Sequence, residues 1–161
     1  MKKKLLMAMV LVLIFAASAA ADVSVSKRSY AGAQGIGIGL EGGYWGGLSI
    51  KSWTGSDTAF QFNADFHFNG YFGGGVAHLW HFFEVIQVDG NKFPLYIGLK
   101  AGIWAHPDGF ALSGLVPFGI AWIPRDIPID IFIQYEPGIQ ILPGIGPDYM
   151  GGTAGIRLWF N

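Results

Sequence analysis

Residues 60 to 69 read Phe-Gln-Phe-Asn-Ala-Asp-Phe-His-Phe-Asn, with apolar and polar residues in strict alternation. Successive side chains of an extended strand point to opposite faces of a sheet, so one face of this segment is apolar and the other polar. The bulky apolar residues are Phe60, Phe62, Phe66 and Phe68. The segment therefore predicts a β-strand with one face in an apolar medium and the other against water or polar partners.

Charged residues are scarce in this chain of 161 residues, at 13%, where soluble domains carry about 25%. Aromatic residues make up 16%, and there are 25 glycines. Beyond the first residues of the chain, no apolar run approaches the roughly 20 residues of a membrane-spanning helix. Because only helices and closed barrels satisfy every backbone group in lipid, this composition favours a transmembrane β-barrel.

The N-terminus has the pattern of a secretory signal peptide. Three lysines precede an apolar run that ends in small residues, and we expect cleavage after Ala21. This predicts a signal peptide at residues 1–21, a polar lead-in at 22–31 and one barrel domain at 32–161. Removing the leader leaves 7 basic against 11 acidic residues, a net charge of −4, which argues against a nucleic-acid partner. With no cysteine, the chain has no disulfide and no thiolate metal site.

Turn signals divide the rest of the chain into eight segments long enough to span a membrane as strands. Glycine, asparagine, aspartate and proline lie between them, and the short connections suit an antiparallel up-and-down arrangement. The predicted strands are 32–40, 44–53, 58–69, 72–88, 94–105, 110–123, 128–142 and 150–160.

The fourth predicted strand, 72–88, has no clean alternation from His78 to Val88. Two explanations remain open at this point: a β-bulge that shifts the parity, and an extension of the strand beyond the edge of the membrane.

The composition of the polar face indicates which side of the barrel is inside. It is rich in glycine and serine, which a crowded eight-stranded lumen accommodates, while the opposite face is bulky and apolar, as lipid requires. The predicted lipid-facing residues are Phe60, Phe62, Phe66, Phe68, Ile131, Ile133 and Leu158. The predicted polar network of the lumen comprises Glu41, Lys51, Asp65, Lys100, Asp130, Glu136 and Arg157. Counting along the last hairpin predicts an ion pair between Glu136 and Arg157.

The signal peptide, the eight alternating strands and the closing residues Gly155 to Phe160 resemble the small outer-membrane β-barrels of diderm bacteria, in the OmpA and OmpX size class. The stretch from Val116 to Ile139, with 150–157 after it, is also similar to a family of uncharacterised outer-membrane barrels. The resemblance implies residence in the bacterial outer membrane, contact with its lipid, and insertion by machinery that reads an aromatic residue in the last strand.

We expect a structural or surface-interaction role, with no catalytic centre, metal or other cofactor, and a lumen plugged by its own polar side chains. Two alternatives remain. A narrow ion-conducting pore would use the same lumen charges. A lipid A-modifying enzyme would need a serine, a histidine and an acid near the outer leaflet, for which His106, Asp108 and Ser113 are the candidates.

Overall fold

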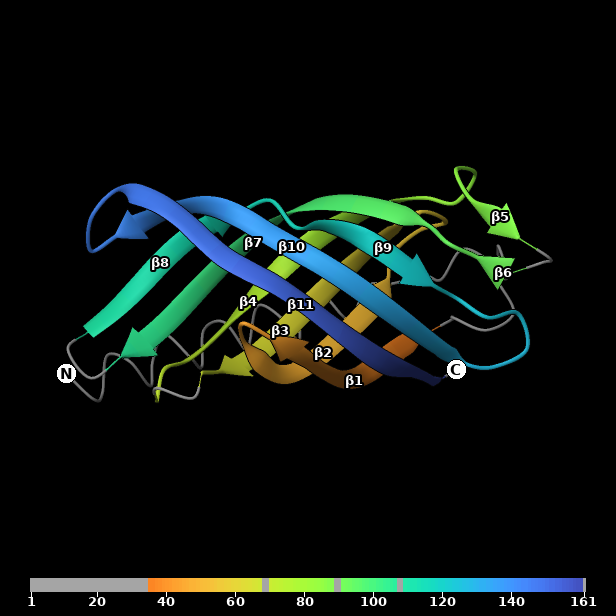
Figure 1. Cartoon of the computed structure of the whole chain (residues 1–161), viewed down its shortest axis with the longest axis horizontal. Coiled ribbons are helices and arrows are strands. Elements are labelled where there is room, and N and C mark those ends of the chain that lie inside the picture. The colour runs from red at the N-terminus through yellow and green to blue at the C-terminus, as the bar shows by residue number, and fades with distance from the viewer. Residues whose placement is uncertain (1–34, 68–69, 89–90, 107–108, 161) are drawn as a thin grey trace.

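The computed structural model describes residues 35–67, 70–88, 91–106 and 109–160, and these residues form an antiparallel β-structure (Figure 1). The predicted all-β, antiparallel class is confirmed. No helix long and apolar enough to cross a membrane occurs among the described residues. The leader, the lead-in and Phe68 of the sequence predictions lie outside these ranges.

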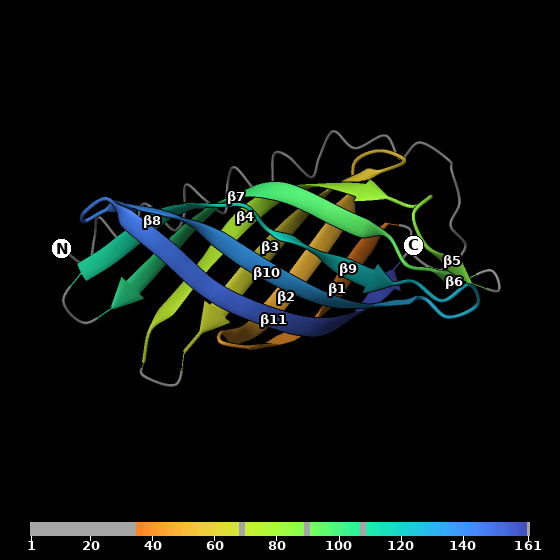
Figure 2. The same ribbon diagram turned by 45° about the horizontal axis from the view of Figure 1, so that its top comes forward.

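One sheet of nine strands dominates the molecule and closes on itself. Its order is β11-β1-β2-β3-β4-β7-β8-β10, and β10 pairs with β11, so eight strands make a ring. The strands of the ring are β1 (Ile36–Gly43), β2 (Gly46–Trp53), β3 (Thr58–Phe66), β4 (Phe72–Phe82), β7 (Leu95–His106), β8 (Gly109–Leu115), β10 (Ile129–Leu142) and β11 (Gly146–Phe160). They run obliquely to the long axis of the molecule (Figures 1 and 2).

The ninth strand, β9 (Phe118–Trp122), continues β8 after a break at Val116 and Pro117. Both strands lie between β7 and β10. Pro117 has no N–H to donate, but its carbonyl accepts from the Gly98 N–H at 2.8 Å, and the Val116 N–H donates to the Pro137 carbonyl at 2.8 Å. The predicted sixth strand, 110–123, is therefore two short strands that share one position in the ring.

The predicted fourth strand is wrong in its length. Strand β4 ends at Phe82, and the residues after it form a separate small hairpin of β5 (Gln87–Val88) and β6 (Asn91–Lys92). Strand β4 pairs with β3 and β7 without a register shift. Leu79 and His81 are buried while Trp80 and Phe82 are exposed. The alternation thus persists through these residues, and the proposed bulge is wrong.

The last hairpin is tighter than the sequence predicted. The expected loop of residues 143–148 shrinks to the three residues 143–145, because Gly146 to Tyr149 pair with the end of β10. Asp148 lies opposite Gly138, and Gly146 opposite Gln140. A register irregularity between Tyr135 and Pro137 accommodates the proline in β10.

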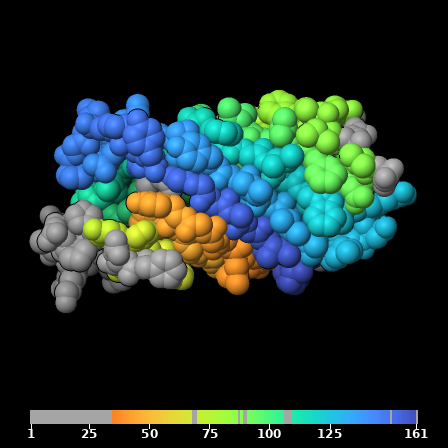
Figure 3. Space-filling model, viewed as in Figure 1, coloured from red at the N-terminus to blue at the C-terminus, as the bar shows by residue number. Residues whose placement is uncertain are grey.

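The two ends of the ring differ. The C-terminal end carries the loop between β2 and β3, the β5–β6 hairpin and the end of β11 (Figure 2). The opposite end carries the β1–β2 and β10–β11 turns. Side chains of β10 and β11 form a continuous surface along the near side of the ring (Figure 3).

Candidate functional site

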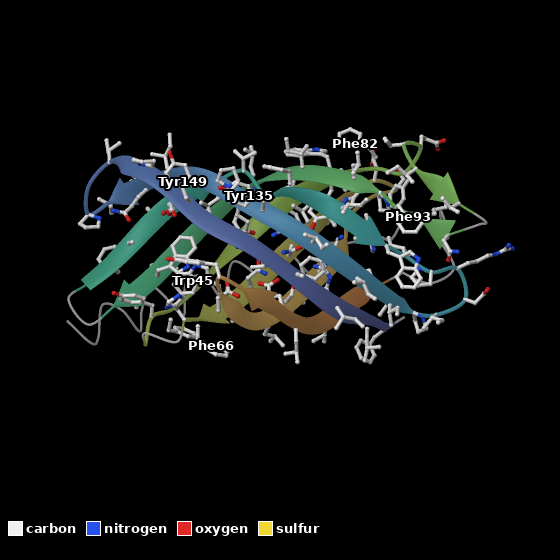
Figure 4. The ribbon with its side chains drawn as sticks, viewed as in Figure 1. Trp45, Phe66, Phe82, Phe93, Tyr135 and Tyr149 are labelled. Carbon is white, nitrogen blue, oxygen red and sulfur yellow. The ribbon has the colours of Figure 1, made fainter. Side chains whose placement is uncertain are left out.

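Large apolar side chains cover the outside of the ring, and the seven charged residues of the predicted polar network lie inside it. Among the predicted lipid-facing residues, Ile133 is 64% exposed and Leu158 54%, and Phe66 and Ile131 are also exposed. Phe66, Phe82 and Tyr149 project away from the ribbon (Figure 4). Phe60 is half-buried because its ring packs against His78, with ring centroids 5.0 Å apart. Phe62 is half-buried as well.

All seven residues of the predicted polar network are buried inside the ring, each at most 7% exposed. They separate into three groups along its axis. We call these the arginine cluster, the lysine cluster and the carboxyl pair.

The arginine cluster holds Arg157, Asp130, Lys51, Gln61 and Ser49. The Arg157 Nε donates to Asp130 Oδ1 at 2.8 Å, and its Nη1 donates to Gln61 Oε1 at 2.9 Å and to Ser49 Oγ at 3.2 Å. Lys51 Nζ lies 3.8 Å from Asp130 Oδ2. Two cations thus share one carboxylate, and side chains from β2, β3, β10 and β11 are tied together across the interior.

The guanidinium group of Arg157 also stacks on an aromatic ring. Its Cζ lies 4.0 Å from the centroid of Phe132, a cation–π contact whose strength increases when both groups are removed from water. Lys51 makes similar contacts with Trp53 and Tyr96, with Nζ 4.8 and 5.4 Å from the two ring centroids.

The predicted pair of Glu136 and Arg157 is wrong. Arg157 lies opposite Asp130 on the neighbouring strand, and Glu136 binds Lys100 instead. The error follows from the last hairpin. A loop of residues 143–148 places Glu136 close to the level of Arg157, but the shorter turn moves the register of β11 along β10.

The lysine cluster centres on Lys100 and Glu136. The Lys100 Nζ donates to both carboxylate oxygens of Glu136, at 2.7 and 2.9 Å. The Gln134 Nε2 donates to Glu136 Oε1, and the Tyr96 hydroxyl donates to Gln134 Oε1 at 2.9 Å. The charges of this ion pair are therefore matched, and its polar neighbours extend the network toward the arginine cluster.

The carboxyl pair consists of Glu41 and Asp65. The Asn63 Nδ2 donates to Glu41 Oε1, and the Gln61 Nε2 donates to Asn63 Oδ1 at 3.4 Å, which links the pair to the arginine cluster. Glu41 Oε2 and Asp65 Oδ1 are buried and have no hydrogen-bond partner within the described part of the chain.

Aromatic side chains close the interior at both ends. At the C-terminal end, the rings of Trp53 and Trp159 stack with centroids 6.0 Å apart, and Phe83 packs on Trp53 at 5.7 Å. At the opposite end, Trp45 lies 6.2 Å from Trp104, measured between ring centroids, and within the outline of the ribbon (Figure 4).

The sequence analysis missed these aromatic plugs. Trp53 is not among the residues predicted for the interior, yet it is only 7% exposed. A signal was present, because Trp53 shares the parity of Ser49 and Lys51 on the inner face of β2. His81 was likewise left without a role, and it is buried at 4.5 Å from the Trp53 ring.

Inward glycines make room for the plugs. A Cβ at Gly37 would lie 2.9 Å from a ring atom of Trp159, and one at Gly102 would overlap the ring of Trp104. The glycine-rich inner face is thus the counterpart of the bulky aromatic residues.

The candidate residues for lipid A chemistry are only partly described. The side chain of Ser113 is on the inner face, 1% exposed, and its hydroxyl donates to Asp148. Asp108 lies outside the described residues. His78 and His81 occupy opposite faces of β4. In the part of the chain that the structure describes, no three acidic or histidine side chains gather in a group that could hold a metal ion.

Comparison with known proteins gives no relative. No family model matches the chain, and neither a curated protein nor a solved structure matches it.

Proposed function

We propose that this protein is an eight-stranded transmembrane β-barrel of the bacterial outer membrane, with a structural or surface-interaction role. The observation that carries the proposal is that apolar side chains cover the outside of the ring while charged side chains are buried inside it, the reverse of a water-soluble protein. Leu40, Leu99 and Ile133 are each more than 60% exposed outside, while Arg157, Lys51 and Asp130 are fully buried inside. A water-soluble protein rarely exposes so large an apolar surface, whereas lipid requires one.

The closed ring supports this reading, because unpaired strand edges are not tolerated in hydrocarbon. Its strands are 8 to 15 residues long where they are unbroken. A tilted spanning strand needs about 9–11 residues. Exposed aromatic residues such as Tyr44 and Tyr149, at 56% and 71%, suit the boundary between lipid and water.

The filled interior favours a plugged barrel over a pore. The ion pairs of Arg157 and Lys100 cross the middle of the ring, and aromatic residues cover both ends. A ring of eight strands leaves an interior that side chains can fill completely. An ion path would have to break these contacts, so we propose that the charges brace the strands and do not conduct.

A role in catalysis is not part of the proposal. The lipid A-modifying alternative needs an activated serine that reaches the outer leaflet, and Ser113 is enclosed on the inner face beside Asp148. A surface role fits the β10–β11 hairpin better, because Ile145 at its tip is 87% exposed. The barrel-insertion machinery would be a partner during assembly, with Phe160 at the end of β11 as the aromatic residue it reads.

Gel migration of the mature chain refolded in detergent tests the barrel. A folded barrel resists the denaturing detergent until it is boiled, so we expect different migration before and after heating. Identical migration, together with helical circular dichroism, would overturn the assignment.

Planar-bilayer recording of the same material tests the plug. We expect no stable open steps of porin size, and their appearance would refute the plugged interior while leaving the barrel intact.

A further inference from the structure

His78 is an exception on the apolar outer wall of the ring. Among the side chains that the structure describes, it is the only histidine, acid or base that faces outward on a strand of the ring. It shares the outward face of β4 with Val76, Trp80 and Phe82. Ionisable side chains are costly in a membrane, and in spanning segments they usually serve binding or transport.

The imidazole of His78 has no hydrogen-bond or ion-pair partner within the described ranges. Its neighbours are aromatic, with ring centroids 5.0 Å away for Phe60 and 4.6 Å away for Trp80. These rings hold the imidazole in place but offer at most the weak acceptor of a π face. Because an imidazole always carries at least one N–H donor, His78 can donate to an acceptor that comes from outside the chain.

A shallow apolar groove lies beside His78 on the outer wall and has a volume of about 520 Å³. Phe60, His78 and Leu99 line it and are direct neighbours across β3, β4 and β7. The imidazole is therefore part of the wall of the groove.

Small side chains on three neighbouring strands form the rest of this surface. Val76 of β4 pairs with Ala101 of β7, and Ala101 pairs with Gly114 of β8. We call these three residues the groove floor. A Cβ at Gly114 would have only the tip of Ile141 near it, at 4.0 Å. In a membrane such a depression is filled from outside, since an empty one forfeits packing contacts.

His78 lies between the groove floor and a row of amphipathic residues nearer the C-terminal end of the ring. That row holds Trp80, Ile97, Phe118 and Tyr135. Tryptophan and tyrosine favour the boundary between membrane and water. Two residues of a strand span about 7 Å, so His78 lies just beneath this boundary. The ester carbonyls of a lipid lie at that depth, and its acyl chains continue toward the groove floor.

We propose that the groove binds one diacyl phospholipid, with an acyl chain along the groove floor and an ester carbonyl that accepts a hydrogen bond from His78. The groove by itself would take any hydrocarbon chain, and His78 any acceptor, but the two side by side fit a molecule that has both. A second copy of the chain fits less well, because its outer wall offers mainly apolar side chains to the imidazole. The inference rests on the proposed membrane location and names the lipid that the wall selects.

Native mass spectrometry of the refolded protein, released from detergent, tests the proposal. The probes are a diacyl phosphatidylethanolamine and its dialkyl ether analogue, which has the same head group and chain length but no ester carbonyl. We expect one diacyl lipid to stay bound to the wild type. The ether lipid should bind about three- to tenfold more weakly, the range of a single hydrogen bond.

Substitutions at His78 test the hydrogen bond. His78→Phe keeps an aromatic ring between Phe60 and Trp80 but removes the N–H. It should bind the diacyl lipid about three- to tenfold more weakly than wild type and should no longer distinguish it from the ether analogue. His78→Gln keeps an N–H donor and should restore part of the difference.

A substitution in the groove floor tests the chain site. Gly114→Leu fills the groove, so it should weaken the binding of both lipids by about tenfold. The matched control is Gly42→Leu on the outward face of β1, where nothing lies within 4 Å of an added Cβ. This variant should bind both lipids like wild type.

Equal binding of the two lipids by the wild type would overturn the role of His78, and this comparison needs no variant. Equal binding by Gly114→Leu and Gly42→Leu would overturn the groove. A lipid-free species of two chains that Gly114→Leu abolishes would overturn the proposal in favour of an interface between copies. Heat-dependent gel migration of every sample separates these results from a chain that forms no barrel, which would overturn the proposed function as well.

Discussion

Arg157 illustrates how single residues hold this molecule together. Its side chain is fully buried and makes hydrogen bonds to three residues on three other strands. Removing such a charge from water costs several kcal/mol, and only matched partners offset that cost. The ion pairs are thus weak evidence for high stability but strong evidence for a fixed interior. Losing one partner leaves the other as an uncompensated buried charge, which lowers the free energy of unfolding.

Replacing Asp130 tests this view. Asp130→Asn keeps the shape of the side chain but leaves Arg157 and Lys51 without their shared counter-charge. We expect the free energy of unfolding to fall by about 3–5 kcal/mol, measured by urea titration of the refolded protein.

Asp126→Asn, which touches no ion pair among the described residues, is the matched control and should unfold like wild type. A small effect of Asp130→Asn would mean that water reaches the cluster and replaces the carboxylate.

The inward glycines make a second residue-scale prediction. A Cβ at Gly102 would overlap the Trp104 ring, so Gly102→Ala should lower the free energy of unfolding by about 1–3 kcal/mol, the usual range for overpacking. The control is Gly114→Ala on the exposed face of β8, where the nearest side-chain atom would lie 4.0 Å away. Equal urea midpoints for the two variants would show that Trp104 does not fill the interior as described.

Among the elements, the strands were predictable from sequence but their register was not. A period of two identifies the inner and outer face of β3 or β10 without ambiguity. It does not say which residue faces which across a turn. The residues Pro147 and Asp148 have the composition of a loop, yet they belong to β11, because β10 extends far enough to pair with them.

The fourth and sixth predicted strands, 72–88 and 110–123, show that alternation does not fix strand boundaries either. The mixed polarity from His78 to Val88 left two explanations open, a bulge and an extension beyond the membrane edge, whereas β4 is regular and ends at Phe82. The break at Pro117 is invisible to alternation, because both pieces keep the same parity on either side of it. The local pattern thus identifies the inner and outer face of each strand. Where a strand begins and ends is fixed only by its pairing within the whole sheet.

Cysteine cross-linking checks the register of the last hairpin. The native chain has no cysteine, so any disulfide within a chain must join the two introduced cysteines. Ile131 and Ile156 are direct partners on β10 and β11, and Ile131→Cys with Ile156→Cys should form a disulfide under mild oxidation.

The contrasting pair is Tyr135→Cys with Leu158→Cys. These residues would face each other if Glu136 lay opposite Arg157, but Leu158 pairs with Ile129, about 20 Å along the strand from Tyr135. Efficient cross-linking of the contrasting pair alone would contradict the register described above.

At the scale of the whole molecule, the amino-acid composition was enough to predict the architecture. Few charges and many aromatic residues without a spanning helix predicted an antiparallel β-structure, and the ring of eight strands agrees with that. The interior was predictable as a set, because all seven charged residues share the inner parity. Their partners were not, since a contact such as Lys100 with Glu136 joins strands that are not neighbours in the ring.

The closing of the interior by aromatic residues is also a property of the whole molecule. Trp53, Phe83 and Trp159 come from three different strands or loops and meet only once the ring has formed. No local pattern distinguishes such a tryptophan from one at a membrane interface.

The central claim is that hydrocarbon covers the outside of the ring, and fluorescence from single labelled cysteines in lipid vesicles tests it most directly. An environment-sensitive dye at Leu99→Cys or Ile133→Cys should emit as in an apolar medium and be quenched by brominated acyl chains. The same dye at Ser56→Cys, in the loop between β2 and β3, should emit as in water. Aqueous emission at Leu99 and Ile133 from folded protein would contradict the account.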